Sequence, residues 1–241
     1  MKIATWNIER AQRKKKLGAI IAACEQENAD ILVLTEADEQ VKPSGYPFCF
    51  STQPPKAHEL PPYPTPVQYA PTERRVILYT RYPCVRCHPT YDAATAICVE
   101  LQTEMGNLLV YGSIIGIYGH RKPFYMDDLQ GQMEDLQNLA GEGHSICFLG
   151  DYNCSFADSY YPHSAARSKM LACFDSMGME LLTKDRPECI DHIAISKSFI
   201  GAAPVSIQEW NEGKHLSDHK GIAVSFGFLH SRPPIIPQDL L

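Results

Sequence analysis

The sequence predicts an α/β fold of the α+β type, in which two packed, mostly antiparallel sheets carry helices on their outer faces. Short apolar runs with strand character outnumber the segments with helical periodicity. Most of these runs are separated by hairpin-length connections, with helices inserted at a few points. The strict alternation of strand and helix that a doubly wound sheet requires is missing from the sequence.

The first elements are a strand at residues 2–8, where β-forming residues alternate with others, and a helix at 12–28, where apolar residues recur at helical spacing. The run 30–36 is continuously apolar and ends in a carboxylate, which is typical of a strand buried on both faces. Residues 52–72 are rich in proline, which breaks helices and strands. We predict a long surface loop there, because the strand pattern resumes at 75–80.

The remaining elements follow from the same patterns. Strands are predicted at 94–101, 108–117, 145–149, 190–195, 205–209 and 221–226, and helices at 124–140 and 164–176. We expect residues 1–230 to form one domain, and the proline-containing segment 231–241 to be a flexible tail.

Composition restricts the class of protein. The chain has 241 residues, of which 44% are hydrophobic and 21% charged, so it can build a core without disulfides. A net charge of -6 argues against a long non-specific nucleic-acid footprint, which needs many Lys and Arg contacts to phosphate. A nuclease with a short footprint remains compatible, because a bound metal ion adds positive charge within the cleft.

The cysteines and the apolar segments of the sequence indicate the cellular compartment in which we expect the protein. The nine cysteines are odd in number and scattered, and the first residues form a predicted strand without the apolar core of a signal peptide. No apolar run approaches membrane-spanning length. We therefore expect a cytoplasmic protein with reduced thiols and no membrane association.

Polar side chains gather at the ends of the predicted strands. They are Asn7, Glu36, Asp151, Asn153, Asp191, Asp218 and His219. Taken singly, each has an ordinary explanation as a turn residue, a helix cap or a structural hydrogen-bonding group. Taken together they should lie on one rim above the sheets, where catalytic groups collect.

Five short motifs carry a family resemblance. They are Trp6-Asn7-Ile8, Leu34-Thr35-Glu36, Gly150-Asp151-Tyr152-Asn153, Ile190-Asp191-His192-Ile193 and Ser217-Asp218-His219. In order and spacing they resemble the endonuclease/exonuclease/phosphatase superfamily, which includes DNase I, exonuclease III and the AP endonucleases. The resemblance covers almost the whole chain and implies a four-layer α/β sandwich with a single active site between the sheet edges.

The resemblance also implies a metal-dependent mechanism. Glu36 would be the principal ligand of Mg²⁺ or Mn²⁺, with Asn7 and Asp218 close by, since hard cations prefer carboxylate and amide oxygens. The resemblance implies four catalytic residues. Asp151 would orient or deprotonate the attacking water, and Asn153 would donate a hydrogen bond to a phosphate oxygen. His219 would stabilise the transition state, and Asp191 would fix the tautomer of His219.

Two positions depart from the family pattern. Many members carry a catalytic Tyr or His after the strand that corresponds to 108–117, and here Tyr118 and His120 are both present without a clean match. We favour His120, because the DNase-like branch uses His at this place and this residue follows the end of the strand. Tyr118 stays an alternative, as does a rim position without a role.

The densest basic run is a candidate for binding substrate phosphates. It consists of Arg13, Lys14, Lys15 and Lys16, near the start of the first helix, with Arg75 as a weaker candidate. The alternative is a solvated helix face.

The sequence therefore predicts metal-dependent hydrolysis of phosphodiester bonds, with nucleic acid as the preferred substrate and endo- or exonucleolytic cleavage both open. One alternative is a phosphatase or phosphodiesterase acting on an inositol phosphate, a lipid or another small phosphoester. Another is a catalytically inactive binding module, which the intact polar set opposes.

Overall fold

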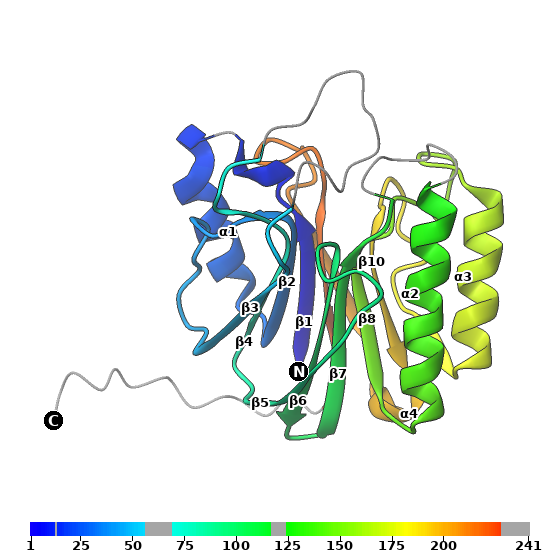
Figure 1. Ribbon diagram of the computed structural model, residues 1–241. Helices are drawn as coiled ribbons and strands as arrows, with labels where there is room; N and C mark the ends of the chain where they lie inside the picture. Colours follow the sequence, from blue (N-terminus) through cyan, green and yellow to red (C-terminus); the bar gives the residue numbers. More distant parts are fainter. Residues whose placement is uncertain (13, 56–68, 117–123, 228–241) are drawn as a thin grey trace, which may run out of the picture.

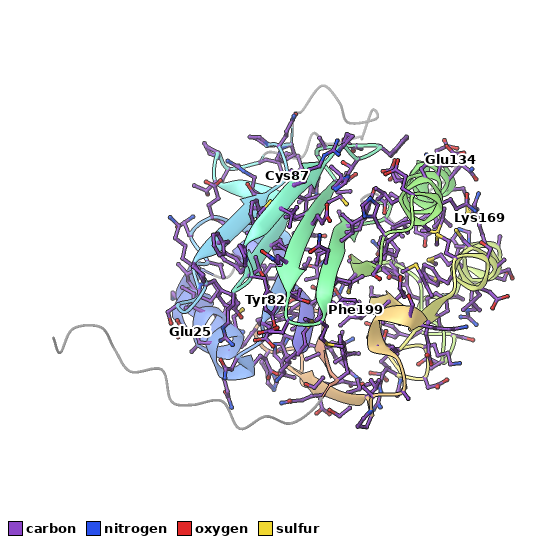
Figure 2. All side chains as sticks on the ribbon, turned by 90° about the horizontal axis from the view of Figure 1, so that it is seen from below. Glu25, Tyr82, Cys87, Glu134, Lys169 and Phe199 are labelled. Atoms are coloured by element: carbon purple, nitrogen blue, oxygen red, sulfur yellow. The ribbon has the colours of Figure 1, made fainter. Side chains whose placement is uncertain are left out.

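The computed structural model describes residues 1–12, 14–55, 69–116 and 124–227. In this part of the chain, two six-stranded sheets pack face to face, with α1 outside one sheet and α2 and α3 outside the other (Figure 1). The view along the strands in Figure 2 shows Glu25 of α1 on one side of the sheets and Glu134 of α2 and Lys169 of α3 on the other. The predicted four-layer sandwich is confirmed.

The first sheet has the strand order β11-β12-β1-β2-β4-β3. Its strands are β1 (Lys2–Asn7), β2 (Ile31–Asp38), β3 (Phe48–Ser51), β4 (Glu73–Thr80), β11 (Ser206–Trp210) and β12 (Gly221–Ser225). Only β1 and β2 run parallel to each other, and the other neighbours in this sheet are antiparallel. Helix α1 (Leu17–Glu27) covers the outer face, where Ile20 and Cys24 pack with Trp6 and Leu34.

The second sheet has the order β5-β6-β7-β8-β10-β9. Its strands are β5 (Cys84–His88), β6 (Ala96–Thr103), β7 (Gly106–Ile114), β8 (Ile146–Asp151), β9 (Met179–Leu181) and β10 (Asp191–Ser196). Its one parallel pair is β7 with β8, the counterpart of β1 with β2. Helices α2 (Phe124–Gly141) and α3 (Ser164–Ser176) cover its outer face, and the short α4 (Lys197–Ile200) follows β10.

The central strands are buried on both faces, which explains their continuous apolar runs. In β2, Ile31 and Val33 face the opposite sheet, whereas Leu32 and Leu34 face α1. The layer between the sheets is an apolar core to which both sheets contribute alternate residues of their strands. This layer fixes how the ends of the two sets of strands meet.

One glycine sets how closely the two sheets approach. A Cβ atom on Gly112, near the end of β7, would lie 3.1 Å from the Cγ1 atoms of both Val33 and Val76 on the facing sheet. Interiors are close-packed, so even one added methyl group must be accommodated by movement of its neighbours.

Several sequence-based predictions need correction. The helix expected from residue 12 begins only at Leu17, after short 3₁₀ turns at Glu9–Ala11 and Lys14–Lys16. Apolar periodicity starts at Leu17, and the basic residues before it offer no apolar face to bury. The strand expected to reach residue 117 ends at Ile114, and Gly116 follows with a φ of 63°.

Four short elements were not predicted at all: β3, β5, β9 and α4. All three strands are edge strands, and their short, partly exposed sequences carry little apolar pattern. Most of the proline-rich loop and all of the predicted tail lie outside the described residues. Within the described residues, no helix has the length and apolar character needed to span a bilayer.

We expect Gly112→Val to lower the free energy of unfolding by about 1–3 kcal/mol, because the added atoms overpack the layer between the sheets. Gly18→Ala is the matched control, since a Cβ at this exposed position of α1 meets nothing within 4 Å. It should stabilise the protein by about 0.5–1 kcal/mol. Urea unfolding of both variants checks the pair, and equal effects would show that Gly112 does not limit the approach of the sheets.

Candidate active site

The polar strand ends of both sheets meet at the upper edge of the molecule in Figure 1. Asn7 and Glu36 come from the parallel strands β1 and β2, and Asp151 ends β8. Asp191 is the register partner of Asp151 on the neighbouring strand β10. A pocket of about 310 Å³ opens here. It is lined by Glu36, Asp151, Asn153, Tyr160, Tyr161, Glu188, Cys189, Ile190, Asp191, Lys214, Asp218, His219 and Lys220.

Asn7 links the two sheets directly. Its Nδ2 donates to Asp151 Oδ2 at 3.0 Å, and its Oδ1 accepts from the backbone N–H of Glu9 at 2.9 Å. Its carbonyl oxygen accepts from Ser217 Oγ at 2.6 Å. Asn7 thus joins β1 to the end of β8 and to the loop before β12, and its side chain holds the Asp151 carboxylate.

Gly150 explains why the motif at the end of β8 starts with glycine. Its φ is +135°, and a Cβ atom there would lie 1.9 Å from the carbonyl oxygen of Ser113 on β7. No other residue type fits this close approach without moving the backbone. The tight contact between β7 and β8 therefore determines where Asp151 enters the pocket.

Asp151 is buried at the base of the site. The backbone N–H of Asn153 donates to its Oδ1 at 2.9 Å. Burial raises the pKa of Asp151 to about 7; the charge of His219 opposes this shift and that of Asp191 adds to it. A carboxylate with a pKa in this range is suited to accept a proton near neutral pH.

Asn153 positions Asp151 in this structure. Its Nδ2 donates to the carbonyl oxygen of Ile115 at 3.0 Å and to Asp151 Oδ2 at 3.3 Å. Its backbone φ of 46° is left-handed, a conformation that asparagine tolerates better than most residues. Its role as a phosphate donor stays a prediction.

His219 and Asp191 form a pair across the two sheets. The distance from His219 Nδ1 to Asp191 Oδ2 is 2.6 Å. Burial alone would lower the pKa of His219, but the charge and hydrogen bond of Asp191, together with the other nearby carboxylates, raise it to about 10. The imidazole is therefore protonated at neutral pH, with Nδ1–H donating to Asp191.

The backbone of His219 is also fixed. Its carbonyl oxygen accepts from Trp6 Nε1 at 3.2 Å and from Asn211 Nδ2 at 2.6 Å. Its N–H donates to Ser217 Oγ at 3.2 Å. The tryptophan of the first motif thus supports the histidine of the fifth.

His192, which follows Asp191 in the chain, differs from His219 because its imidazole is neutral. It is fully buried, its Nε2 lies 3.0 Å from the carbonyl oxygen of Cys154, and its Nδ1 lies 2.9 Å from Thr183 Oγ1. Because a carbonyl only accepts, Nε2 carries the proton and Nδ1 accepts from Thr183. Burial lowers the pKa of His192 to about 4, so it is neutral and anchors the strand that presents Asp191.

Glu36 is the carboxylate best placed for a cation. It lines the pocket, its φ is 41°, and its side chain makes no hydrogen bond or ion pair with the described residues. Asp218 is 62% exposed at its side chain, with Oδ1 3.8 Å from His219 Nε2. The Oδ1 atom of Asp191 is buried without a hydrogen-bond partner among these residues.

These donors fit a hard cation. No group of three or more His, Cys, Asp or Glu side chains in the described ranges converges enough to enclose a metal ion. Mg²⁺ is typically held by one or two carboxylates and keeps several waters, so an open site with Glu36 and Asp218 in its lining suits it. Asn7 is not among the residues that line the pocket, and its Oδ1 already accepts from Glu9, so its role as a metal ligand stays a prediction.

Of the predicted basic residues, the described side chains of Lys15, Lys16 and Arg75 do not line the pocket. Lys16 Nζ donates to the carbonyl oxygen of His215, and Lys15 is exposed. The guanidinium of the buried Arg75 lies 4.6 Å from the centre of the Tyr69 ring and donates to its hydroxyl group. Arg13, Tyr118, His120 and the side chain of Lys14 lie outside the described residues. The roles of all these residues stay predictions.

Sequence reasoning missed part of the pocket wall. Tyr160, Tyr161, Glu188, Lys214 and Lys220 line it from loops. Loops carry no periodic pattern, and nothing in the sequence shows which loop residues point inward. The one available signal was that Tyr160 and Tyr161 follow closely after Asp151 in the chain.

Comparison with known proteins gives the class. The family model described as Endonuclease/Exonuclease/phosphatase family matches residues 4–219. The chain belongs to this family, whose members are hydrolases that act on phosphoester bonds and generally depend on divalent metals. No curated protein sequence matches the chain.

Solved structures share the fold at low sequence identity. A family protein from Beutenbergia cavernae is 15% identical, with a TM-score of 0.69, covering 94% of this chain and 72% of its own. A 3′ phosphatase from Neisseria bound to a product DNA hairpin is 19% identical, with a TM-score of 0.65 and coverage of 95% and 100%. An AP endonuclease from Archaeoglobus fulgidus is 14% identical, with a TM-score of 0.65 and the same coverage.

The neutral state of His192 predicts a pH dependence of stability. In the unfolded chain an imidazole takes up a proton near pH 6.5, whereas in the folded protein His192 does so only near 4. The contribution of neutral His192 is therefore fully present above pH 6.5 and is lost as the pH falls from there toward 4. The loss should reach about 3 kcal/mol.

Urea unfolding between pH 7 and 4.5 checks this prediction. His192→Gln should be less stable than the wild type at pH 7, and its stability should decline less on acidification. Parallel pH profiles for the two proteins would show that His192 is not the group responsible.

Proposed function

We propose that the chain hydrolyses phosphodiester bonds in nucleic acid and uses Mg²⁺ or Mn²⁺ bound at Glu36. One observation carries this proposal. Asp151 and the hydrogen-bonded pair of His219 and Asp191 line the same pocket, and Glu36 lines it too. A base, a protonated donor and a free carboxylate are what cleavage of a stable phosphate anion requires.

The residues of the chain divide the work. Asp151, held by Asn7 and Asn153, accepts the proton of the attacking water. Asp191 keeps Nδ1 of His219 occupied, which leaves Nε2–H to donate to a phosphate oxygen as charge develops. A bound divalent cation neutralises part of the phosphate charge.

Nucleic acid is the preferred substrate class. Similar folds include a 3′ phosphatase bound to a product DNA hairpin and an AP endonuclease, and these two relatives support a nucleic-acid substrate. The net charge of -6 favours a short footprint on the strand. Action on a terminal phosphate or on a small phosphoester would use the same pocket, and the substrate panel below separates these alternatives.

We expect activity on oligonucleotides to require Mg²⁺ or Mn²⁺ and to be abolished by excess EDTA, because the pocket contributes oxygen donors suited to a hard cation. Glu36→Gln should raise the metal concentration needed for half-maximal rate by about 10-fold or more, on the scale of losing a charged ligand. Rates measured against metal concentration on DNA, RNA, abasic DNA and inositol phosphates check this. Full activity in EDTA would contradict the metal assignment.

We expect Asp191→Ala and His219→Ala each to lower turnover by about 10²–10⁴-fold. The double variant should lose little more than either single variant, because the two residues act as one unit. His88→Ala is a matched control: His88 Nε2 lies 3.3 Å from Glu100 Oε2, but neither residue lines the pocket. Additive losses in the double-mutant cycle would show that Asp191 acts independently of His219.

A further inference from the structure

Two loops meet across the mouth of the pocket. The loop that joins β11 to β12 carries Lys214, and the loop that follows β8 carries Tyr160, so each sheet contributes one loop. Lys214 Nζ donates to the Tyr160 hydroxyl at 2.6 Å and lies 4.3 Å from the centre of its ring. Both residues line the pocket, and neither is explained by the chemistry described above.

The backbone of Lys214 is strained. Its φ is 52°, in the left-handed region that favours glycine, and its N–H donates to the carbonyl oxygen of Asn211 at 2.8 Å. A non-glycine residue is disfavoured in such a conformation, and such strain is concentrated at functional sites. A lysine therefore occupies a position where glycine would be more stable.

The charge of Lys214 has no carboxylate partner. In the described part of the chain no carboxylate oxygen lies within 4.0 Å of its ammonium group. The other pocket lysine, Lys220, differs, because its Nζ lies 3.3 Å from Glu209 Oε2 and 3.1 Å from the carbonyl oxygen of Pro187. Of the two lysines that line the pocket, Lys214 is therefore the one whose positive charge can attract an anion.

The contact with Tyr160 holds the ammonium group of Lys214 in place and leaves some of its N–H donors unpaired among the described residues. An ammonium group has three N–H donors, and the Tyr160 hydroxyl accepts one of them. The ring face adds a cation–π contact that also attracts the ammonium group. Two donors remain for oxygens of a ligand.

We propose that Lys214, held by Tyr160, binds the phosphate next to the one that is cleaved. The pocket would then prefer a substrate with at least two phosphates along a strand over an isolated phosphoester. A lysine acts on phosphate as a point charge, so this contact adds affinity without reading the base sequence. The inference rests on the proposed function and specifies its substrate class.

Steady-state kinetics on two substrates test the inference. One is a dinucleoside monophosphate, which has a single phosphodiester and no neighbouring phosphate, and the other is an oligonucleotide. Lys214→Gly should raise KM for the oligonucleotide about tenfold with little change in kcat, and should leave KM for the dinucleoside monophosphate unchanged. The slope of log affinity against log salt should fall by about 0.7–0.9 for the oligonucleotide alone.

The variants are chosen to separate binding from folding. Lys214→Gly relieves the strained φ, so its thermal stability should equal or exceed that of the wild type. Tyr160→Phe keeps the ring and removes the hydroxyl group, and should give a smaller rise in KM. Lys197→Ala, an exposed lysine that does not line the pocket, should match the wild type on both substrates.

Four results would overturn the inference. An unchanged KM for Lys214→Gly on the oligonucleotide, or an equal rise on both substrates, would show that Lys214 does not bind a neighbouring phosphate. A flattened salt slope on replacing Lys14, Lys15 and Lys16 by Ala, with no effect of Lys214→Gly, would place the contact on the basic run instead. A wild type that cleaves small phosphoesters but neither of the two substrates would overturn the proposed function as well.

Discussion

The burial of two apolar sheet faces against each other is the interaction on which the rest of the molecule depends. Each sheet alone ends in a few polar side chains that could do little. Packing brings Asn7 of the first sheet to Asp151 of the second, and His219 of the first to Asp191 of the second. The rim contact of Lys214 with Tyr160 also joins the two sheets. The site is therefore a property of the sheet interface, and of neither sheet by itself.

The electrostatics of the site follow from this convergence. Burial places Asp151 and Asp191 close to the single imidazolium of His219, while Glu36 adds a further carboxylate to the pocket. The negative charge raises the pKa of His219 strongly and keeps it protonated, and the pKa of Asp151 rises because burial outweighs the attraction of that cation. A pocket with more carboxylates than cations attracts a positive ion, and through that ion it attracts a phosphate.

The sequence was most informative where physical constraints act on every residue of a segment. Strands such as β2 and β8 are buried on both faces, so their apolar runs revealed them, whereas the edge strands β3 and β5 have half-exposed sequences without such a signal. Asp151 and His219 could be singled out because they stand beside apolar strands within family motifs.

Lys214 could not be found in this way, because its position depends on how two loops from different sheets meet. The basic run at residues 13–16 drew attention for the opposite reason. Charge density is visible in a sequence, but the direction of a side chain is not, and Lys16 points to a loop carbonyl outside the pocket lining.

The pairing of β1 with β12 has a consequence for when the pocket is completed during synthesis. Lys2 is the register partner of Ser225, so the first sheet is completed only after nearly all of the described chain has been synthesised. Contacts between such distant residues form slowly, and until β12 arrives one edge of the apolar strand β1 stays unpaired and prone to aggregation. Ser217 and His219 arrive with β12, so a growing chain holds Asp151 and Asp191 long before it holds a complete site. The pocket therefore gains its full set of side chains only after the segment that contains β12 has been made.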